Sequence, residues 1–242
     1  MSRLDPESAL APERHARRLP HEETLAGYDR WSQTYDATKN PMVAATAFAL
    51  ERWPFEVAAE DVVELGCGTG RHVEAILRAG ARSYTGVDGS AGMLEVASRC
   101  VRDPRVRWVR APLQALPDAD HSFGAALLVL VLEHLEDLHA AFLEIARVLR
   151  PGGRLRVLEI HSDLLLTGTN AHFEDDGVEV RFASFCHTGD EIATALSAVG
   201  FEILERRELA AEAELLQRAP KLAKHGARRI LIDLEARKRL AR

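Results

Sequence analysis

Cysteine is scarce in this chain, and its three copies, Cys67, Cys100 and Cys186, are odd in number and far apart. That pattern predicts neither a disulfide framework nor a zinc site, so we expect no bound metal and a reducing, cytoplasmic environment. Long apolar runs are absent too: the longest, residues 124–132, is far shorter than the ~20 residues that span a bilayer. A basic excess is also missing, because the net charge is −6. We therefore expect neither a membrane nor a nucleic acid as a partner.

The most informative stretch of the sequence is residues 62–70, VVELGCGTG, in which an apolar run leads into alternating glycines. Gly66, Gly68 and Gly70 allow the backbone to turn sharply and let a ligand lie against it. Asp88 follows 22 residues after Gly66, at the end of a second apolar run. An acid at that place can bind the two hydroxyls of a ribose. The pattern predicts a site for a nucleoside cofactor.

Two details of this stretch narrow the choice of nucleoside. The spacing is G-x-G-x-G, whereas dinucleotide enzymes use G-x-G-x-x-G. Glu64 lies two residues before the first glycine, and could bind the ammonium of an amino-acid moiety directly or through water. Cys67 is interpreted as a small filler whose backbone faces the ligand rather than as a reactive thiol.

Apolar runs and helical patterns alternate along most of the chain. Strands are predicted at residues 62–65, 84–87, 106–109, 123–131, 154–160, 201–205 and 229–234. Helix starts are indicated by capping residues at Ser90, Asp137 and Thr188. This alternation predicts an α/β fold with a doubly wound sheet, whose ligands bind at the carboxyl ends of the strands.

The chain divides into three predicted parts. Residues 1–22 mix charge and proline, and we expect a flexible arm. Residues 23–56 carry two helical patterns, and residues 57–242 form the α/β domain. Within that domain, residues 161–187 have no clear helical period, and a loop of this length is usually functional. A single polar helix is predicted at residues 210–223.

Four motifs in order resemble those of a known family. Residues 64–70 (ELGCGTG), 86–94 (GVDGSAGML) and 149–153 (LRPGG) look like the successive motifs of class I S-adenosylmethionine-dependent methyltransferases. Residues 28–36 (YDRWSQTYD) look like the N-terminal lid helix of the group with ubiquinone/menaquinone-biosynthesis and malonyl-carrier methyltransferases. The resemblance covers residues 25–240. It implies a Rossmann-like, seven-stranded sheet, mostly parallel with an antiparallel last strand. Residues 23–56 then become lid helices, and residues 161–187 an acceptor-binding insertion.

The resemblance also implies the reaction and the cofactor site. A methyl group would pass from S-adenosylmethionine to an oxygen, nitrogen or carbon atom of a small-molecule acceptor by in-line displacement, releasing S-adenosylhomocysteine. Asp88 would hold the ribose hydroxyls, while Pro112 replaces the aspartate that many members place near the adenine. For Tyr28 and Tyr35, plain packing is an equal rival to cofactor contact. The implied cofactor residues are Tyr28, Tyr35, Glu64, Gly66, Cys67, Gly68, Asp88, Gly89, Met93, Pro112, Leu113 and Leu130.

Histidines near the ends of the fourth and fifth strands, and in the long insertion at residues 161–187, are candidates for a base that removes a proton from the acceptor. We predict catalytic roles for His134, His161 and His187. Two alternatives remain open: a methyltransferase-like module that binds the cofactor without transferring anything, and, less favoured, a NAD-type oxidoreductase. The expected oligomeric state is a monomer or a homodimer.

Overall fold

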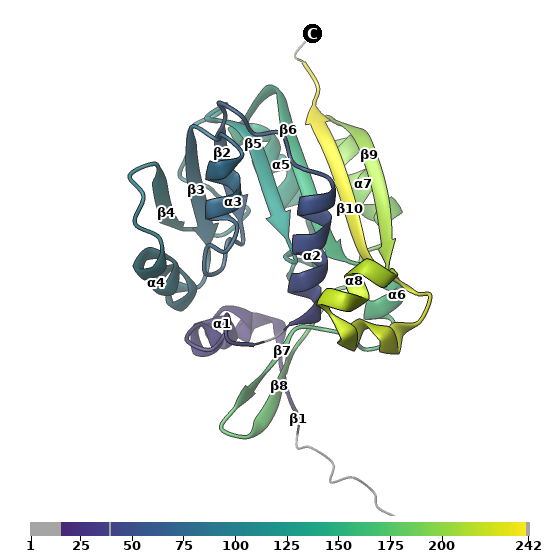
Figure 1. The fold of residues 1–242 in the computed structure, drawn as a ribbon. Helices are drawn as coiled ribbons and strands as arrows, with labels where there is room; N and C mark the ends of the chain where they lie inside the picture. Colours follow the sequence, from purple (N-terminus) through teal and green to yellow (C-terminus); the bar gives the residue numbers. More distant parts are fainter. Residues whose placement is uncertain (1–15, 39, 241–242) are drawn as a thin grey trace, which may run out of the picture.

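The computed structural model describes residues 16–38 and 40–240. Its large sheet has the strand order β4-β3-β2-β5-β6-β10-β9 (Figure 1). The bounds are β2 (Asp61–Leu65), β3 (Ser83–Asp88), β4 (Val106–Arg110), β5 (Phe123–Val129), β6 (Leu149–Ile160), β9 (Phe201–Ala210) and β10 (Arg229–Lys238). Neighbours from β4 to β6 pair in parallel, and β10 is antiparallel to both β6 and β9. The predicted Rossmann-like sheet with an antiparallel last strand is confirmed.

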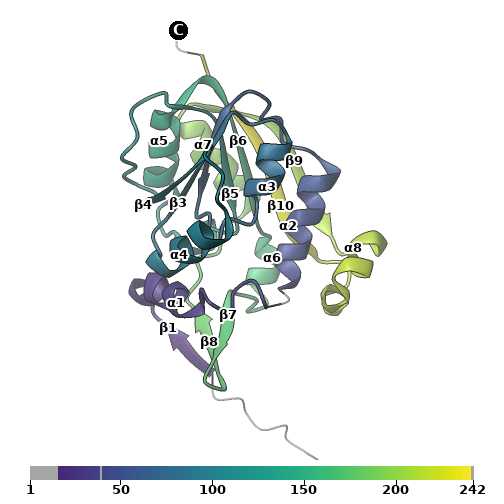
Figure 2. The same ribbon diagram turned by 60° about the vertical axis from the view of Figure 1, so that its left-hand side comes forward.

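Helices cover both faces of this sheet (Figures 1 and 2). Their bounds are α1 (Thr24–Trp31), α2 (Pro41–Arg52), α3 (Val73–Arg78), α4 (Ala91–Cys100), α5 (Leu138–Val148), α6 (Ser162–Leu165), α7 (Gly189–Ala198) and α8 (Ala213–Arg218), with 3-10 turns η1 (His21–Glu23), η2 (Leu132–His134) and η3 (Pro220–His225). The predicted caps Ser90, Asp137 and Thr188 all bond to the first turn of their helices.

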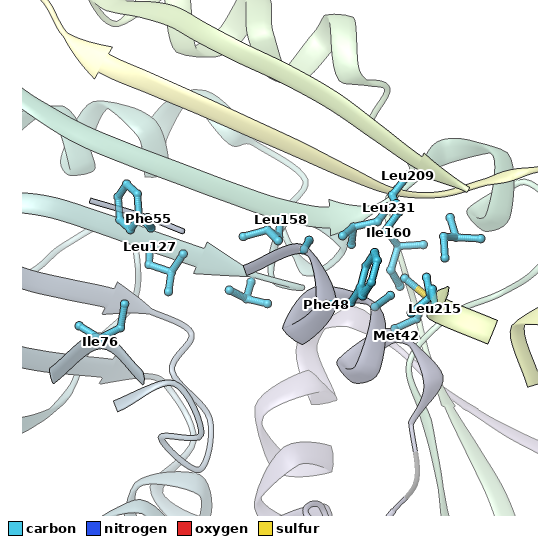
Figure 3. Close-up of a cluster of buried hydrophobic side chains, with 14 of the residues drawn as sticks. Met42, Phe48, Phe55, Ile76, Leu127, Leu158, Ile160, Leu209, Leu215 and Leu231 are labelled. Carbon is cyan, nitrogen blue, oxygen red and sulfur yellow. The ribbon is translucent and has the colours of Figure 1, made fainter. Parts of the chain in front are cut away.

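The two faces of the sheet carry separate apolar cores, because successive strand residues point to opposite sides. Leu127 of β5 packs with Phe48 of α2 and Ile76 of α3 in one core, part of which Figure 3 displays. Its neighbour Leu128 packs with Phe142 of α5 in the other. Every residue of β5 is buried, as expected for a central strand of a parallel sheet.

A second, three-stranded sheet lies beside α1, with the order β1-β8-β7 (Figure 2). Its strands are β1 (Ala16–Leu19), β7 (His172–Asp175) and β8 (Val178–Phe182). Asp176 and Gly177 join β7 to β8 with positive φ angles of 48° and 79°, as in a tight hairpin turn. β1 pairs in parallel with β8. The insertion at residues 161–187 thus contains α6 and a hairpin.

Several expected boundaries differ from the observed ones. Residues 16–19, expected in the flexible arm, form β1 because β8 offers them a sheet edge; residues 1–15 lie outside the described part. The expected helix at residues 210–223 is two pieces, α8 and η3, since Pro220 has no N–H to continue a helix. β6 begins at Leu149 rather than 154, and β9 and β10 are longer than predicted because they pair along their whole length.

Candidate active site

A cavity of about 320 Å³ lies at the carboxyl ends of β2, β3 and β5, under α1. Most of the predicted site residues line it: Tyr28, Tyr35, Gly66, Gly68, Asp88, Gly89, Met93, Pro112, Leu113, Leu130 and His134. Residues that the sequence did not single out line it too, among them His21, Glu22, Thr24 and Leu25. The loops after three separate strands therefore converge on one hollow, as expected for a doubly wound sheet.

The glycine-rich turn forms the floor of the cavity. Gly66, Gly68 and Gly70 have φ angles of 70°, 53° and 77°, which residues other than glycine rarely adopt. A Cβ on Gly66 would lie 2.5 Å from Val131 Cγ2, so that position has no room for one. A Cβ on Gly68 would have only Tyr35 Cε1 near it, at 4.0 Å. The Gly68 backbone therefore faces open space in which a ligand can lie against it.

Asp88 lies at the end of β3, beside the glycine-rich turn. Its Oδ2 accepts a hydrogen bond from Gly68 N, and its Oδ1 accepts one from Ser90 N, both at 2.8 Å. Burial raises the pKa of this carboxyl, while the two N–H donors act in the opposite direction. Each carboxylate oxygen can accept a second bond. Both oxygens can therefore still receive the hydroxyls of a ribose, and the donor set fits a nucleoside.

The part of the cavity beyond Asp88 is mainly apolar. Met93, Pro112 and Leu113 line it. Leu25 covers Gly89, where an added Cβ would lie 2.7 Å from Leu25 Cδ2. Apolar side chains on both sides of a narrow space suit a flat heterocycle such as adenine.

Glu64 and Cys67 line a smaller neighbouring cavity instead. Glu64 is fully buried: its Oε1 lies 2.7 Å from His72 Nδ1, and its Oε2 accepts a hydrogen bond from the Tyr84 hydroxyl at 2.6 Å. The predicted contact of Glu64 with an ammonium group stays a prediction. Burial raises the pKa of the Cys67 thiol well above its usual range. The thiol is thus kept protonated, as the filler interpretation expects.

Tyr28 and His134 form a hydrogen-bonded pair on the wall of the cavity. The Tyr28 hydroxyl lies 2.7 Å from His134 Nε2. Burial lowers the pKa of His134 to about 4 and raises that of Tyr28 well above its usual range. Both groups are therefore neutral near pH 7. His21 Nε2, at 2.6 Å from the His134 carbonyl oxygen, fixes the backbone of the same turn.

Aromatic rings of α1 and the small sheet pack around the Tyr28–His134 pair. Tyr28 stacks on Phe182 of β8 with ring centroids 4.6 Å apart, and Trp31 stacks on Phe173 of β7 at 5.4 Å. Tyr35 meets Trp31 edge to face at 4.6 Å. Tyr28 and Tyr35 therefore both pack against other aromatic rings and line the cavity. The insertion and α1 together form the roof of the site.

Two buried acids hold η2, the turn that carries His134. Glu159, at the end of β6, accepts hydrogen bonds from the N–H groups of Val131, Leu132 and Ile160 at 2.9, 2.5 and 2.8 Å. Glu133 Oε2 accepts one from the Ser184 hydroxyl at 2.8 Å. Burial raises the pKa of both carboxyls, that of Glu159 to about 8. The pair therefore tends to retain a proton near neutral pH.

The other two predicted catalytic histidines do not line the cavity. His161 caps the short helix α6, and its Nδ1 accepts a hydrogen bond from Asp163 N at 3.0 Å. His187 Nε2 lies 2.7 Å from the Leu135 carbonyl oxygen. Both contacts are structural, and the geometry therefore gives no support for catalytic roles of these two residues. Their predicted catalytic roles stay predictions.

A larger cavity, about 550 Å³, lies at the opposite edge of the sheet. Its charged side chains bond to one another, Arg150 to Glu60 and Arg154 to Glu56, and Arg154 also bonds to Glu235 of β10. Across residues 16–38 and 40–240, no cluster of three or more His, Cys, Asp or Glu side chains is arranged to hold a metal ion. In the same part of the chain, no helix has the length and apolar character to cross a membrane.

The fold and the cavity together define a Rossmann-like protein with a cavity at its strand ends whose lining fits a nucleoside. Residues 63–157 match the methyltransferase domain family. A demethylmenaquinone methyltransferase from Tropheryma whipplei is 41% identical over 103 residues, which make up 42% of this chain and 42% of that protein. An O-methyltransferase from Aspergillus nomiae is 30% identical over 158 residues, 62% of this chain and 67% of that protein.

The crystal structure of an S-adenosylmethionine-dependent methyltransferase from Mesorhizobium loti has the same fold. It aligns with a TM-score of 0.69 at 24% identity and covers 82% of this chain and 100% of that one. The match to the Tropheryma whipplei protein spans less than half of its length, while the match to the Aspergillus nomiae protein spans two thirds. This chain belongs to the class I S-adenosylmethionine-dependent methyltransferases.

Proposed function

We propose that this protein transfers a methyl group from S-adenosylmethionine to a small-molecule acceptor with an acidic hydroxyl group, releasing S-adenosylhomocysteine. Membership of the family supports the cofactor and the class of reaction. The observation that carries the acceptor class is the Tyr28–His134 pair, which lines the same cavity as Gly66 and Asp88. A relative named as an O-methyltransferase agrees with methylation at oxygen.

The residues that would hold the cofactor are those of the floor and the strand ends. The turn from Gly66 to Gly68 would lie against the methionine part, Asp88 would accept the ribose hydroxyls, and Met93 and Leu113 would flank the adenine. When bound, S-adenosylmethionine supplies a methyl group already activated on a sulfonium. The main tasks of the protein are then to align the reactants and to exclude water.

An acceptor hydroxyl must lose its proton as it is methylated. We assign the proton-accepting role to the Tyr28 oxygen, whose own proton passes to His134 Nε2 across the 2.7 Å hydrogen bond. The imidazole is neutral at pH 7 and therefore has a lone pair for this proton. Because its lowered pKa of about 4 makes it a weak base, the path suits an acceptor whose hydroxyl is itself acidic. A positioned base of this kind contributes about 10²–10⁴-fold to a rate.

The test is turnover with methyl-labelled S-adenosylmethionine and a panel of phenols and enols, with matched analogues that lack the hydroxyl. We expect labelled product and S-adenosylhomocysteine only from hydroxyl acceptors. In His134→Gln and Tyr28→Phe, turnover should fall by about 10²-fold or more, while the affinity for S-adenosylhomocysteine stays the same. Equal turnover in wild type and His134→Gln would contradict the assigned proton path.

Both alternatives give distinct results in the same experiments. A cofactor-binding module would bind S-adenosylhomocysteine but release none from S-adenosylmethionine with any acceptor. A NAD-type oxidoreductase would bind NAD and not S-adenosylhomocysteine. The glycine spacing at residues 66–70 and the family match argue against the second alternative.

A further inference from the structure

Asp29 of α1 is bound to the start of α4, directly beside the predicted ribose site. Its Oδ1 accepts hydrogen bonds from the Ser90 hydroxyl at 2.6 Å and from Gly92 N at 2.8 Å. The two helices touch closely here, since a Cβ on Gly92 would lie 2.8 Å from Ser32 Oγ. A carboxylate is favoured at this place because the first turn of a helix presents free N–H groups and positive potential.

Asp36, seven residues further along, is bound to the glycine-rich turn. Its Oδ1 accepts hydrogen bonds from the Thr69 hydroxyl and from Arg71 Nη2, both at 2.9 Å. The Arg71 guanidinium also lies over the ring of Tyr35, 4.8 Å from its centroid. This second anchor thus joins the turn that follows α1 in the chain to the other half of the cofactor site.

The apolar and polar contacts of α1 go largely to different places. Trp31, the largest buried side chain of α1, packs against Phe173 and Phe182 of the small sheet. Asp29 and Asp36, in contrast, bind segments of the large domain that form the cofactor site. The roof is therefore an apolar unit of its own, joined to the cofactor loops in part through a few hydrogen bonds to exposed aspartates.

We propose that Asp29 and Asp36 form a latch that holds the roof over the cavity and sets the rate at which the cofactor product leaves. Tyr28 and Tyr35 each directly precede one of the two aspartates in the chain, and both line the cavity. Movement of α1 away from α4 would therefore carry cavity-lining side chains with it and open the site. Each aspartate acts through the roof and does not contact the cofactor. The inference rests on the proposed function, because S-adenosylhomocysteine is the product that must leave.

The test is the rate of S-adenosylhomocysteine release from the full chain, measured by stopped-flow displacement. Wild type is compared with Asp29→Ala, Asp36→Ala and the double variant. A charge-assisted contact typically corresponds to about a tenfold change, so we expect release about tenfold faster in each single variant and about 100-fold faster in the double. Hydrogen exchange of the α1 amides in the bound state should accelerate in the same order.

The matched control is Asp175→Ala. Asp175 pairs with Arg30 of the same helix at 3.6 Å, but it belongs to β7 and touches neither cofactor segment. Its release rate should equal that of wild type. Raising the salt concentration should speed release in wild type more than in Asp36→Ala, because screening weakens the half-exposed Asp36–Arg71 pair.

A double variant that releases S-adenosylhomocysteine at the wild-type rate would overturn the latch, and so would an equal acceleration in Asp175→Ala. Complete loss of binding in a folded variant would also overturn it, because the aspartates would then be direct ligands. Asp29→Asn with Asp36→Asn keeps the side-chain size and should give an intermediate rate if the alanine variants do not fold. Failure of wild type to bind S-adenosylhomocysteine would instead overturn the proposed function.

Discussion

Arg156 and Asp88 are charged side chains of the large sheet that differ in how fully the protein satisfies them. Arg156 is completely buried and donates two hydrogen bonds to Asp233, at 3.0 and 2.8 Å. Two more of its five N–H groups bond to the carbonyls of Ala49 and Trp53, at the end of α2. Asp88 accepts one hydrogen bond from a backbone N–H at each oxygen and lines a cavity. Each of its oxygens can still accept another hydrogen bond.

This difference separates a structural charge from a binding charge. A buried group whose hydrogen bonds all end on the protein stabilises the fold and offers nothing to a ligand. A group that keeps free acceptor positions beside a cavity is placed to bind one. Substitution at Arg156 should therefore lower stability and leave ligand affinity unchanged, whereas substitution at Asp88 should lower ligand affinity and keep the fold.

The largest effect is expected at Arg156. Arg156→Ala removes both hydrogen bonds to the buried Asp233 and leaves it only the longer contact with Arg207, at 3.6 Å, which costs about 3–5 kcal/mol of the free energy of unfolding. Urea unfolding monitored by circular dichroism measures it. Arg156→Met combined with Asp233→Leu should recover most of the loss, because an apolar pair replaces the ionic one. An Arg156→Ala variant as stable as wild type would contradict the structural role assigned to Arg156.

A pH effect of nearly this size is expected at His134. The pKa of His134 is lowered from 6.5 to about 4 in the folded state, so the unfolded chain binds more protons between these values. The stability that depends on a neutral His134 is fully present above about pH 6.5 and is lost as the pH falls towards 4. The free energy of unfolding should fall by about 3 kcal/mol over this range. Between pH 7 and pH 4, wild type should lose that much more stability than His134→Gln. Equal losses would show that His134 titrates normally.

The next effect concerns binding. Asp88→Ala should lower the affinity for S-adenosylhomocysteine about 100-fold, or ~2.7 kcal/mol, because two hydrogen bonds to a charged acceptor are lost. Calorimetric titration measures the affinity, and a melting curve shows whether the fold is kept. Arg156→Met with Asp233→Leu serves as the control, with unchanged affinity. Unchanged affinity in Asp88→Ala would contradict its assignment as the ribose ligand.

The smallest effect is expected at His161. His161→Ala removes the cap of α6 and should cost about 1 kcal/mol of stability. Since His161 does not line the cavity, the affinity for S-adenosylhomocysteine and the turnover should both stay at the wild-type level. A fall in turnover of tenfold or more at full cofactor saturation would restore the catalytic role predicted from the sequence.

The parts of the molecule that local signals specify were predictable. The glycine-rich turn, Asp88 and the caps Ser90 and Asp137 each depend on residues close in sequence, and all occupy the expected places. The seven-stranded, mostly parallel sheet with an antiparallel last strand followed from the resemblance of the motifs, whereas the order of its strands comes from the structure.

Features that depend on distant partners were missed. β1 exists only because β8 lies beside it, about 160 residues later in the chain. His21 acts on the His134 carbonyl, 113 residues away, and nothing near it in the sequence indicates this. The bonds of Glu64 to Tyr84 and His72 were not predicted either, while its contact with an ammonium group stays a prediction. Asp29 and Asp36 lie in a recognised motif, but only the structure gives their partners.

The central claim is that the cavity at the ends of β2, β3 and β5 is a site for S-adenosylmethionine. Calorimetric titration of the wild-type chain with S-adenosylhomocysteine and, separately, with NAD tests it most directly. The structure leads us to expect one molecule of S-adenosylhomocysteine bound per chain and no heat of binding with NAD. Binding of NAD without binding of S-adenosylhomocysteine would contradict the claim.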